Sequence, residues 1–423
     1  MNLIKELEWR GMIQDIIPGT EEQLNKEVTT GYVGFDPTAD SLHIGSLVPI
    51  ILLVHLQKSG HKPIALVGGA TGMVGDPSGK SEERNLLTED VLLHNQQGIR
   101  LQLEKFLDFD TVKTAAEMAN NADWFRDMHF LQFIRDVGKY ITVNYMMAKD
   151  SVKKRLEGES GMSFTEFTYQ LIQGYDFYWL YENKGCKLQM GGSDQWGNIV
   201  TGTELIRKKS GGEAFAFTCP LIRKADGGKF GKTESGNVWL DPNKTSPYQF
   251  YQFWLNCSDS DAETWIKIFT FLDQTTIEAL ILKHKEDASK RLLQRRLAEE
   301  ITEWVHGAEN LKVAILTSAK LFENQQAPVT DLTEDDLQNI EGIVVTSISK
   351  DKFIREDLTT LLVEAGIFPS KGEAKKMIAN GGVSINRNKL QDLHTKPDVS
   401  MLLHGKYVLI QKGKKNYYLL NVG

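Results

Sequence analysis

The stretch that decides the fold is GYVGFDPTADSLHIGSLVPIILLVHLQKSG, residues 31–60. Its first five residues alternate glycine with large apolar side chains and predict a short buried strand. The following 43–59 has the length of a helix, with Gly60 as its stop. Turn and cap formers, including Pro37 and Thr38, stand between the two. Such a strand, loop and helix start is where a parallel α/β sheet usually presents its ligand site.

The same alternation of strands and helices continues as far as about residue 220, with 164–183 as another helical stretch. This order predicts an α/β domain with a parallel sheet between helices. From Ser246 strand signals vanish, and they return only after about Ile348 in a small α+β unit. The predicted segments are an α/β domain (1–220), a connection (221–245), a helical domain (246–322), a polar, acidic linker (323–347) and the α+β domain (348–423).

Composition is that of an ordinary globular protein, since 41% of the 423 residues are hydrophobic and 25% are charged. No apolar run approaches the roughly 20 residues of a membrane helix. The three cysteines are far apart and odd in number, which fits a reducing cytoplasm better than a disulfide framework or a zinc site. We therefore expect a cytoplasmic protein with no membrane association and no protein-bound metal.

Charge is distributed unevenly along the chain. Residues 351–423 contain twelve Lys/Arg and seven Asp/Glu, which gives them a net charge of +5. The whole chain has a net charge of −7, so the first 350 residues have a net charge of −12. A basic tail on an acidic body favours a polyanionic partner, and a solvated lysine-rich surface is the alternative.

Two short motifs have the chemistry of phosphate binding. His43 and Gly45 stand at a predicted helix start, where unpaired N–H groups and a partial positive charge suit an anion. In KFGKTESG, residues 229–236, Lys229 and Lys232 can serve as mobile point charges on phosphates. Each motif alone has a structural alternative, a histidine with a packing role or a solvated charged turn.

Together the two motifs resemble the signature sequences of class I aminoacyl-tRNA synthetases, which hold ATP on either side of its phosphates. Five stretches in the same order resemble the bacterial tyrosyl-tRNA synthetase family: GYVGFDPTADSLHIG, GGATGMVGDPSGKSEER, SFTEFTYQLIQGYDF, GGSDQWGN and KFGKTESG. FPSKGEAKKMIANGGVSINRNKLQD resembles the S4-type RNA-binding domain that ends that family. The resemblance thus covers nearly the whole chain and implies a Rossmann-like catalytic domain, a helical anticodon-side domain and an S4-like domain.

A tyrosine pocket is the first thing that the resemblance implies. Tyr169, Gln173 and Asp176 lie at i, i+4 and i+7 on one face of the predicted helix, although Asp176 could instead face solvent. The resemblance implies that Asp176 and Tyr32 contact the phenol of tyrosine. It implies that Asp76, Tyr169 and Gln173 hold the ammonium group, and that Gln195 orients the carboxylate.

ATP is the second implied substrate, with Mg²⁺ arriving on the nucleotide. The implied catalytic residues are His43, Ser46, Lys229, Lys232, Thr38, Lys80 and Arg84, and the implied nucleotide contacts are Asp36, Gly45, Gly191, Gly192, Asp194 and Lys232. Ser46 departs from the family, which usually has a second histidine there, but a hydroxyl can still donate to an ATP oxygen. The tyrosine carboxylate would attack the α-phosphate while the cationic groups stabilise the departing pyrophosphate.

The third implied partner is tRNA(Tyr), which receives the tyrosine at its 3′ end. The residues expected on its phosphates are Lys371, Lys375, Lys376, Arg387 and Lys389, with a solvated helix face as the alternative. Segment 125–165 would form a homodimer interface, although its aromatic content suits a core equally well. Two other functions stay open, the related tryptophan enzyme and a non-catalytic RNA-binding protein descended from a synthetase.

Overall fold

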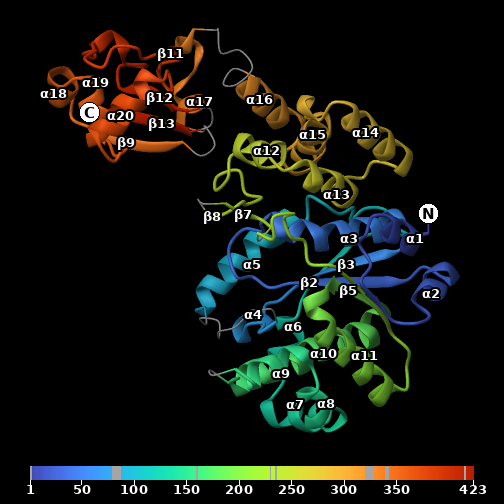
Figure 1. Ribbon diagram of the computed structural model, residues 1–423. Helices are drawn as coiled ribbons and strands as arrows, with labels where there is room; N and C mark the ends of the chain where they lie inside the picture. Colours follow the sequence, from blue (N-terminus) through green and yellow to red (C-terminus); the bar gives the residue numbers. More distant parts are fainter. Residues whose placement is uncertain are drawn as a thin grey trace. The chain divides into compact units, whose positions relative to one another are not determined.

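The computed structural model in Figure 1 describes residues 2–78, 87–158, 161–228, 230–233, 236–319, 328–338, 343–413 and 416–423. The chain forms two compact units, one made of Met1–Thr233, Asn237–Asp241 and Ser258–Leu293, the other of Glu234–Gly236, Pro242–Cys257 and Gln294–Gly423. The predicted helical domain, 246–322, is divided between these units, and the domain boundaries stay a prediction.

The first unit is built around a six-stranded sheet in the order β1-β6-β5-β2-β3-β4. Five neighbouring strands run parallel, and β1 pairs antiparallel with β6. The bounds are Asp15–Ile16 for β1, Thr30–Phe35 for β2, Lys62–Val67 for β3, Glu117–Asn120 for β4, Cys186–Gly192 for β5 and Phe215–Cys219 for β6. This parallel sheet confirms the predicted α/β class.

Helices cover both faces of this sheet, with α3 (Leu47–Lys58) on one face and α10 (Phe164–Lys184) and α11 (Trp196–Ser210) on the other (Figure 1). The helix predicted over 43–59 starts later, because a 3-10 turn, η1 (Ile44–Ser46), comes first. Helix α10 begins at a capping box, in which the Ser163 hydroxyl accepts from the Glu166 backbone N–H, and it ends at a left-handed glycine.

The remaining elements of the first unit connect the strands or extend beyond the sheet. They are α1 (Leu3–Trp9), α2 (Thr20–Lys26), α4 (Thr71–Val74), α5 (Glu89–Leu103), α6 (Ala122–Phe125), α7 (Phe130–Asp136), η2 (Gly138–Tyr140), α8 (Val143–Met147), α9 (Asp150–Leu156), η3 (Ser193–Gln195), β7 (Lys232–Thr233), α13 (Asp259–Phe269), α14 (Gln274–Glu286) and η4 (Ala288–Lys290). Strand β8 (Gly236–Asn237) and helix α15 (Leu292–His306) each extend across a boundary between the units.

The second unit contains helices followed by the predicted α+β domain. Its five-stranded sheet has the order β11-β10-β12-β13-β9, in which only the β13–β9 pair is parallel. Its helices and strands are α12 (Pro247–Leu255), α16 (Ala308–Ser318), η6 (Val329–Asp331), α17 (Glu334–Gln338), β9 (Val344–Ile348), α18 (Lys350–Arg355), α19 (Leu358–Glu364), α20 (Lys371–Ala379), β10 (Val383–Ile385), β11 (Asn388–Lys389), η7 (Val399–Met401), β12 (Tyr407–Lys412) and β13 (Asn416–Val422).

Part of the predicted linker, 323–347, is folded against the C-terminal sheet. In this segment Leu332 and Leu337 are buried. The Gln338 side chain donates to the Tyr407 hydroxyl at 2.8 Å, and Lys406 pairs with Glu334 at 2.7 Å. Two buried leucines in a mostly acidic stretch give too weak a pattern for sequence to reveal this packing. None of the described helices combines the length and apolar character that crossing a membrane requires.

Candidate active site

A cavity of about 350 Å³ lies at the carboxyl ends of β2 and β5 in the first unit. The chain builds the sheet outward in opposite directions from these two neighbouring strands, β3 and β4 on one side and β6 on the other. Such a switch point leaves a crevice beyond the strand ends, which is where parallel sheets bind ligands. The position agrees with the site expected after the first strand.

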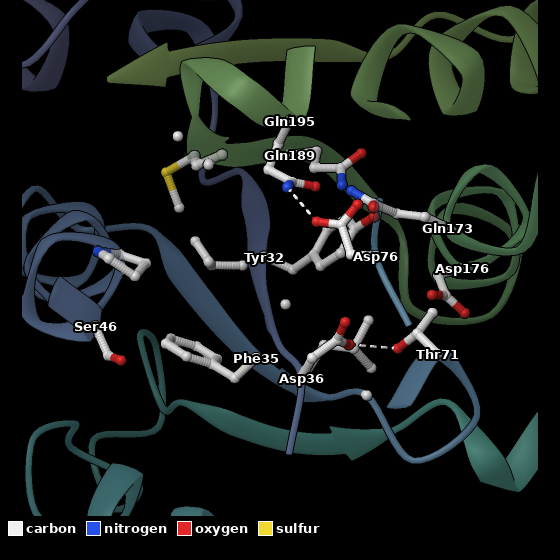
Figure 2. Close-up of a pocket in the computed structure, with 18 of the residues that line it drawn as sticks. Tyr32, Phe35, Asp36, Ser46, Thr71, Asp76, Gln173, Asp176, Gln189 and Gln195 are labelled. Atoms are coloured by element: carbon white, nitrogen blue, oxygen red, sulfur yellow. Dashed lines mark hydrogen bonds between the residues drawn. The ribbon is translucent and has the colours of Figure 1, made fainter. Parts of the chain in front are cut away.

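Predicted residues from stretches far apart in the sequence line this one cavity. They are Tyr32, Asp36, Thr38, His43, Gly45, Ser46, Asp76, Tyr169, Gln173, Asp176, Gly191, Gly192, Asp194 and Gln195. Figure 2 shows Ser46 and Asp176 at opposite ends of the cavity, with Tyr32 and Asp76 between them. The predicted residues Lys80, Arg84 and Lys229 lie outside the described part of the chain, and only the backbone of Lys232 is described.

His43 caps the 3-10 turn at one end of the cavity. Its Nδ1 accepts a hydrogen bond from the Gly45 backbone N–H at 3.0 Å, which leaves the ring proton of a neutral imidazole on Nε2. A Cβ on Gly45 would stand 2.7 Å from the His43 ring, so a side chain there would displace the imidazole. The Ser46 hydroxyl oxygen accepts from the His43 backbone N–H at 3.5 Å and completes a capping box.

The backbone of the predicted lysine loop lies beside this histidine turn. Gly231 has a φ of +83°, and a Cβ there would stand 3.2 Å from the Ile44 side chain. The Val238 backbone joins the two segments, since its N–H donates to Gly231 and its carbonyl accepts from Ile44. The two signature motifs therefore meet at one end of the cavity, although the lysine side chains themselves are not described.

The opposite end of the cavity presents a buried carboxyl group, Asp176. This side chain is 1% exposed and accepts from Trp124 Nε1 at 2.9 Å and from Asn121 Nδ2 at 3.1 Å. Burial raises the pKa of Asp176 to about 8, and the two hydrogen bonds oppose that rise. The alternative that Asp176 faces solvent is therefore wrong.

Tyr32 stands next to this carboxyl group and is also buried. Within the described part of the chain, its hydroxyl has no hydrogen-bond partner. Burial, followed by the charge of Asp176, raises the pKa of Tyr32 well above its usual value, so the hydroxyl stays protonated. The Gln189 side-chain oxygen, also on the cavity wall, is buried without a partner among the same residues. Buried polar atoms of this kind are costly unless a ligand or an ordered water satisfies them.

Carboxylates also gather along the middle of the cavity. The Tyr169 hydroxyl donates to Asp36 Oδ2 at 2.8 Å, and the Thr71 hydroxyl donates to Asp36 Oδ1 at 2.7 Å. Gln195 donates to Asp76 at 2.6 Å, as the dashed line in Figure 2 shows. Asp36, which was expected near the nucleotide, is thus bonded to a residue predicted to hold the ammonium group. A cavity wall with these two carboxylates suits a cation.

The GGSDQWGN stretch forms the wall after β5. Gly191 and Gly192 end the strand, and Asp194 belongs to the short η3 turn that follows. A Cβ on Gly192 would stand 2.6 Å from an Asp194 carboxylate oxygen, so the glycine lets this carboxylate fold back over the strand end. Asp194 then lines the cavity as a hydrogen-bond acceptor.

Sequence reasoning missed the residues that support the predicted ones. Asn121 and Trp124 hold Asp176, Thr71 holds Asp36, and Asn198 donates to Gln173 at 3.0 Å. The polar run NNADW, residues 120–124, directly after a strand was the available signal for the first two.

The residues predicted to contact tRNA lie in the C-terminal α+β domain. Lys371, Lys375 and Lys376 are exposed on α20, whose Ala374 and Ile378 enter the core. Arg387 follows in the turn between β10 and β11 with a left-handed φ of +68°, and Lys389 is exposed on β11. They are thus cationic groups on one helix and one adjoining hairpin.

Family models cover most of the chain. One described as "tRNA synthetases class I (W and Y)" matches residues 24–323, and one described as "Tyrosine--tRNA ligase SYY-like C-terminal domain" matches residues 326–420. A protein of Bacteroides thetaiotaomicron named "Tyrosine--tRNA ligase" is 60% identical, with 99% of both chains covered. One of the same name from Porphyromonas gingivalis is 59% identical, with both chains fully covered.

Solved structures agree with these matches. The C-terminally truncated mitochondrial tyrosyl-tRNA synthetase of Aspergillus nidulans is 31% identical, has a TM-score of 0.69, and matches 76% of this chain and 94% of its own. The Archaeoglobus fulgidus tyrosyl-tRNA synthetase, solved with L-tyrosine, is 15% identical with a TM-score of 0.54 and shows the fold alone. The family models and the full-length relatives agree on one assignment: the chain belongs to the bacterial tyrosyl-tRNA synthetases, a class I family.

Proposed function

We propose that this chain is a tyrosine–tRNA ligase, which activates L-tyrosine with ATP and passes it to the 3′ end of tRNA(Tyr). The observation behind the residue roles is that one cavity has a buried carboxyl group at one end and the His43 turn at the other. One end suits a hydroxylated ring, and the other suits phosphate groups.

The phenol end is the basis for selecting tyrosine. The phenol of the substrate would donate to Asp176 and accept from the Tyr32 hydroxyl, which lacks a partner within the described residues. Phenylalanine offers no hydroxyl, so these buried polar groups would stay unpaired and weaken its binding. Tryptophan has an indole N–H, which can donate but cannot accept from Tyr32. Asp176 and Tyr32 together therefore favour tyrosine over phenylalanine and tryptophan.

The middle of the cavity would hold the amino-acid backbone. Asp76, with Tyr169 and Gln173 on α10, would bind the ammonium group. Gln195 would orient the carboxylate by donating from its amide. Because Tyr169 also donates to Asp36, its ring is fixed before the substrate arrives. Such preorganisation lowers the ordering cost of binding.

Activation requires the tyrosine carboxylate oxygen to form a bond to the α-phosphorus of ATP while the bond to pyrophosphate breaks. The chain would supply alignment and charge and would form no covalent bond to either substrate. His43 would donate from Nε2 to a phosphate oxygen, and Lys229 and Lys232 would neutralise the leaving pyrophosphate. Ser46 can donate its hydroxyl proton while its oxygen accepts from His43. Mg²⁺ would enter as part of the nucleotide substrate.

Residues around the nucleotide complete the assignment. Asp194 would accept from the ribose hydroxyls, next to the small Gly191 and Gly192. Thr38 lines the same cavity and would contact the phosphates. Lys80 and Arg84 keep their predicted place near the phosphates, on the sequence resemblance alone.

tRNA recognition and dimer formation belong to other surfaces. The exposed lysines of α20 and β11, with the half-buried Arg387 between β10 and β11, would bind tRNA phosphates. A homodimer would form through the segment 125–165, where Phe130 is 64% and Leu131 is 78% exposed. Phe130 belongs to the lining of an apolar groove, together with Phe125, Met128, Phe133, Phe164 and Ile172 among others. Apolar patches of this kind mark interfaces. A cytoplasmic location stays a prediction.

Tyrosine-dependent exchange of pyrophosphate into ATP tests the activation step, and charging of tRNA(Tyr) tests the transfer. Exchange that depends on tyrosine and falls in the His43→Ala variant supports the assignment. Binding of tRNA without any exchange would leave only the non-catalytic RNA-binding alternative.

A further inference from the structure

The loop that precedes His43 rests on a helix outside the cavity. Helix α5 has one face toward this loop. That face consists of Asn95, Gly98 and Gln102, at i, i+3 and i+7. The opposite face of α5 lines a separate surface groove through Gln97 and Arg100. The inner face therefore contacts the loop, and beside it His94 Nε2 lies 3.8 Å from the Asp40 carboxylate, whereas Gln97 and Arg100 face away.

Gln102 contacts the loop with both ends of its amide. Its Oε1 accepts from the Leu42 backbone N–H at 2.8 Å, and its Nε2 donates to the Ser41 hydroxyl at 3.0 Å. The Leu42 carbonyl accepts in turn from the Leu240 backbone N–H at 2.8 Å. The peptide groups directly before His43 are thus held from both sides, by α5 and by the segment that follows the lysine loop.

The rest of the α5 face brings the helix against the loop backbone. Asn95 donates to the Pro37 carbonyl at 3.0 Å. A Cβ on Gly98 would clash with the carbonyl oxygen of Asp40, so helix and loop meet with no side chain between them. Three consecutive turns of α5 therefore support the loop from Pro37 to Leu42.

We propose that Gln102 is a positioning residue for tyrosine activation, which sets the place of His43 by fixing the Ser41–Leu42 backbone against α5. This inference rests on the proposed function. Gln102 does not line the cavity and touches neither the tyrosine end nor the ribose wall. Its loss should therefore slow adenylate formation and leave tyrosine affinity unchanged, because a misplacement of about 1 Å at a reacting group can cost on the order of 100-fold in rate.

The test compares three variants in the full chain. Gln102→Ala removes both contacts, Gln102→Glu keeps an acceptor for the Leu42 N–H, and Gln97→Ala removes a glutamine from the outer face of the same helix. We expect kcat for pyrophosphate exchange to fall about 10- to 100-fold in Gln102→Ala, with a largely restored rate in Gln102→Glu. Gln97→Ala should match the unmodified chain, and the Kd for tyrosine should be the same in all four proteins.

Gly98→Ala provides a second, independent measurement. Alanine favours a helix over glycine, so α5 itself is stabilised while the Asp40 carbonyl is displaced. A lower exchange rate in a folded protein with unchanged tyrosine affinity supports the positioning role. Equal exchange rates for Gln102→Ala and Gln97→Ala would overturn it, as would a matching loss of tyrosine affinity. Absence of exchange in the unmodified chain would instead refute the proposed function.

Discussion

Tyr32→Phe tests the phenol end of the cavity most sharply, because it should weaken tyrosine binding without lowering the stability of the protein. The Tyr32 side chain is 1% exposed, and within the described residues its hydroxyl has no partner. A buried polar group without a hydrogen bond costs about 1–3 kcal/mol. Water in the tyrosine-free cavity can pair with this hydroxyl, so its removal should leave the free energy of unfolding of the tyrosine-free protein unchanged or raise it by up to about 1 kcal/mol.

Tyrosine binding, by contrast, should weaken. The bound phenol would accept from the Tyr32 hydroxyl, and a neutral hydrogen bond contributes about 0.5–1.5 kcal/mol. Tyr32→Phe should then weaken tyrosine affinity by roughly 2- to 10-fold. Discrimination against phenylalanine should fall as well, because one of the two groups that pair only with a hydroxyl is gone.

Tyr169→Phe is the matched control, since it removes a hydroxyl from the same cavity that does have a partner. That hydroxyl donates to the Asp36 carboxylate at 2.8 Å without any ligand. Its loss should lower the free energy of unfolding by about 1.5–3 kcal/mol, the value of a hydrogen bond to a charged group. Of the two Tyr→Phe changes, only Tyr169→Phe should therefore lower stability.

Denaturant unfolding without tyrosine measures stability, and a tyrosine titration followed by tryptophan fluorescence measures affinity. Trp124 is a suitable reporter, because it donates to Asp176 and stacks on Trp179 at a ring distance of 4.3 Å. A Tyr32→Phe protein that binds tyrosine as tightly as the unmodified one would refute the phenol contact.

Three further predictions concern other parts of the molecule. The pKa of Asp176 is raised from 3.8 to about 8, so between these pH values its carboxyl group is ionised only in the unfolded state. The free energy of unfolding should therefore fall as pH rises through this window. Asp176→Asn should remove this pH dependence in unfolding measurements. Phe130→Glu should dissociate the proposed dimer into single chains, as measured by analytical ultracentrifugation. A variant with the mass of two chains would contradict this prediction. Removing 328–423, which includes the segment packed on the C-terminal sheet, should preserve exchange but impair tRNA charging; normal charging would show that this region has another role.

The cavity could be predicted where its residues are local in sequence. The strand, loop and histidine turn lie within 31–46, and the stripe of Tyr169, Gln173 and Asp176 follows from helical spacing alone. The helix boundary at 43 was wrong by a few residues, because a 3-10 turn capped by His43 precedes α3.

The supporting contacts could not be predicted, because the fold alone brings their partners together. Asn121 lies 55 positions from Asp176 in sequence, and Gln102 lies 60 positions from Leu42. Glutamines on an amphipathic helix have no sequence signal that separates Gln102, which holds the loop, from Gln97, which faces outward. The packed part of the predicted linker was hidden for a similar reason, since only Leu332 and Leu337 mark it.

An amino-acid panel in the pyrophosphate exchange assay tests the central claim most directly, that one cavity joins a hydroxyl-reading end to a phosphate-binding end. Tyrosine should support exchange, whereas phenylalanine and tryptophan at equal concentration should support little or none. Comparable exchange with tryptophan, or exchange that ignores the phenol hydroxyl, would contradict the roles given to Tyr32 and Asp176.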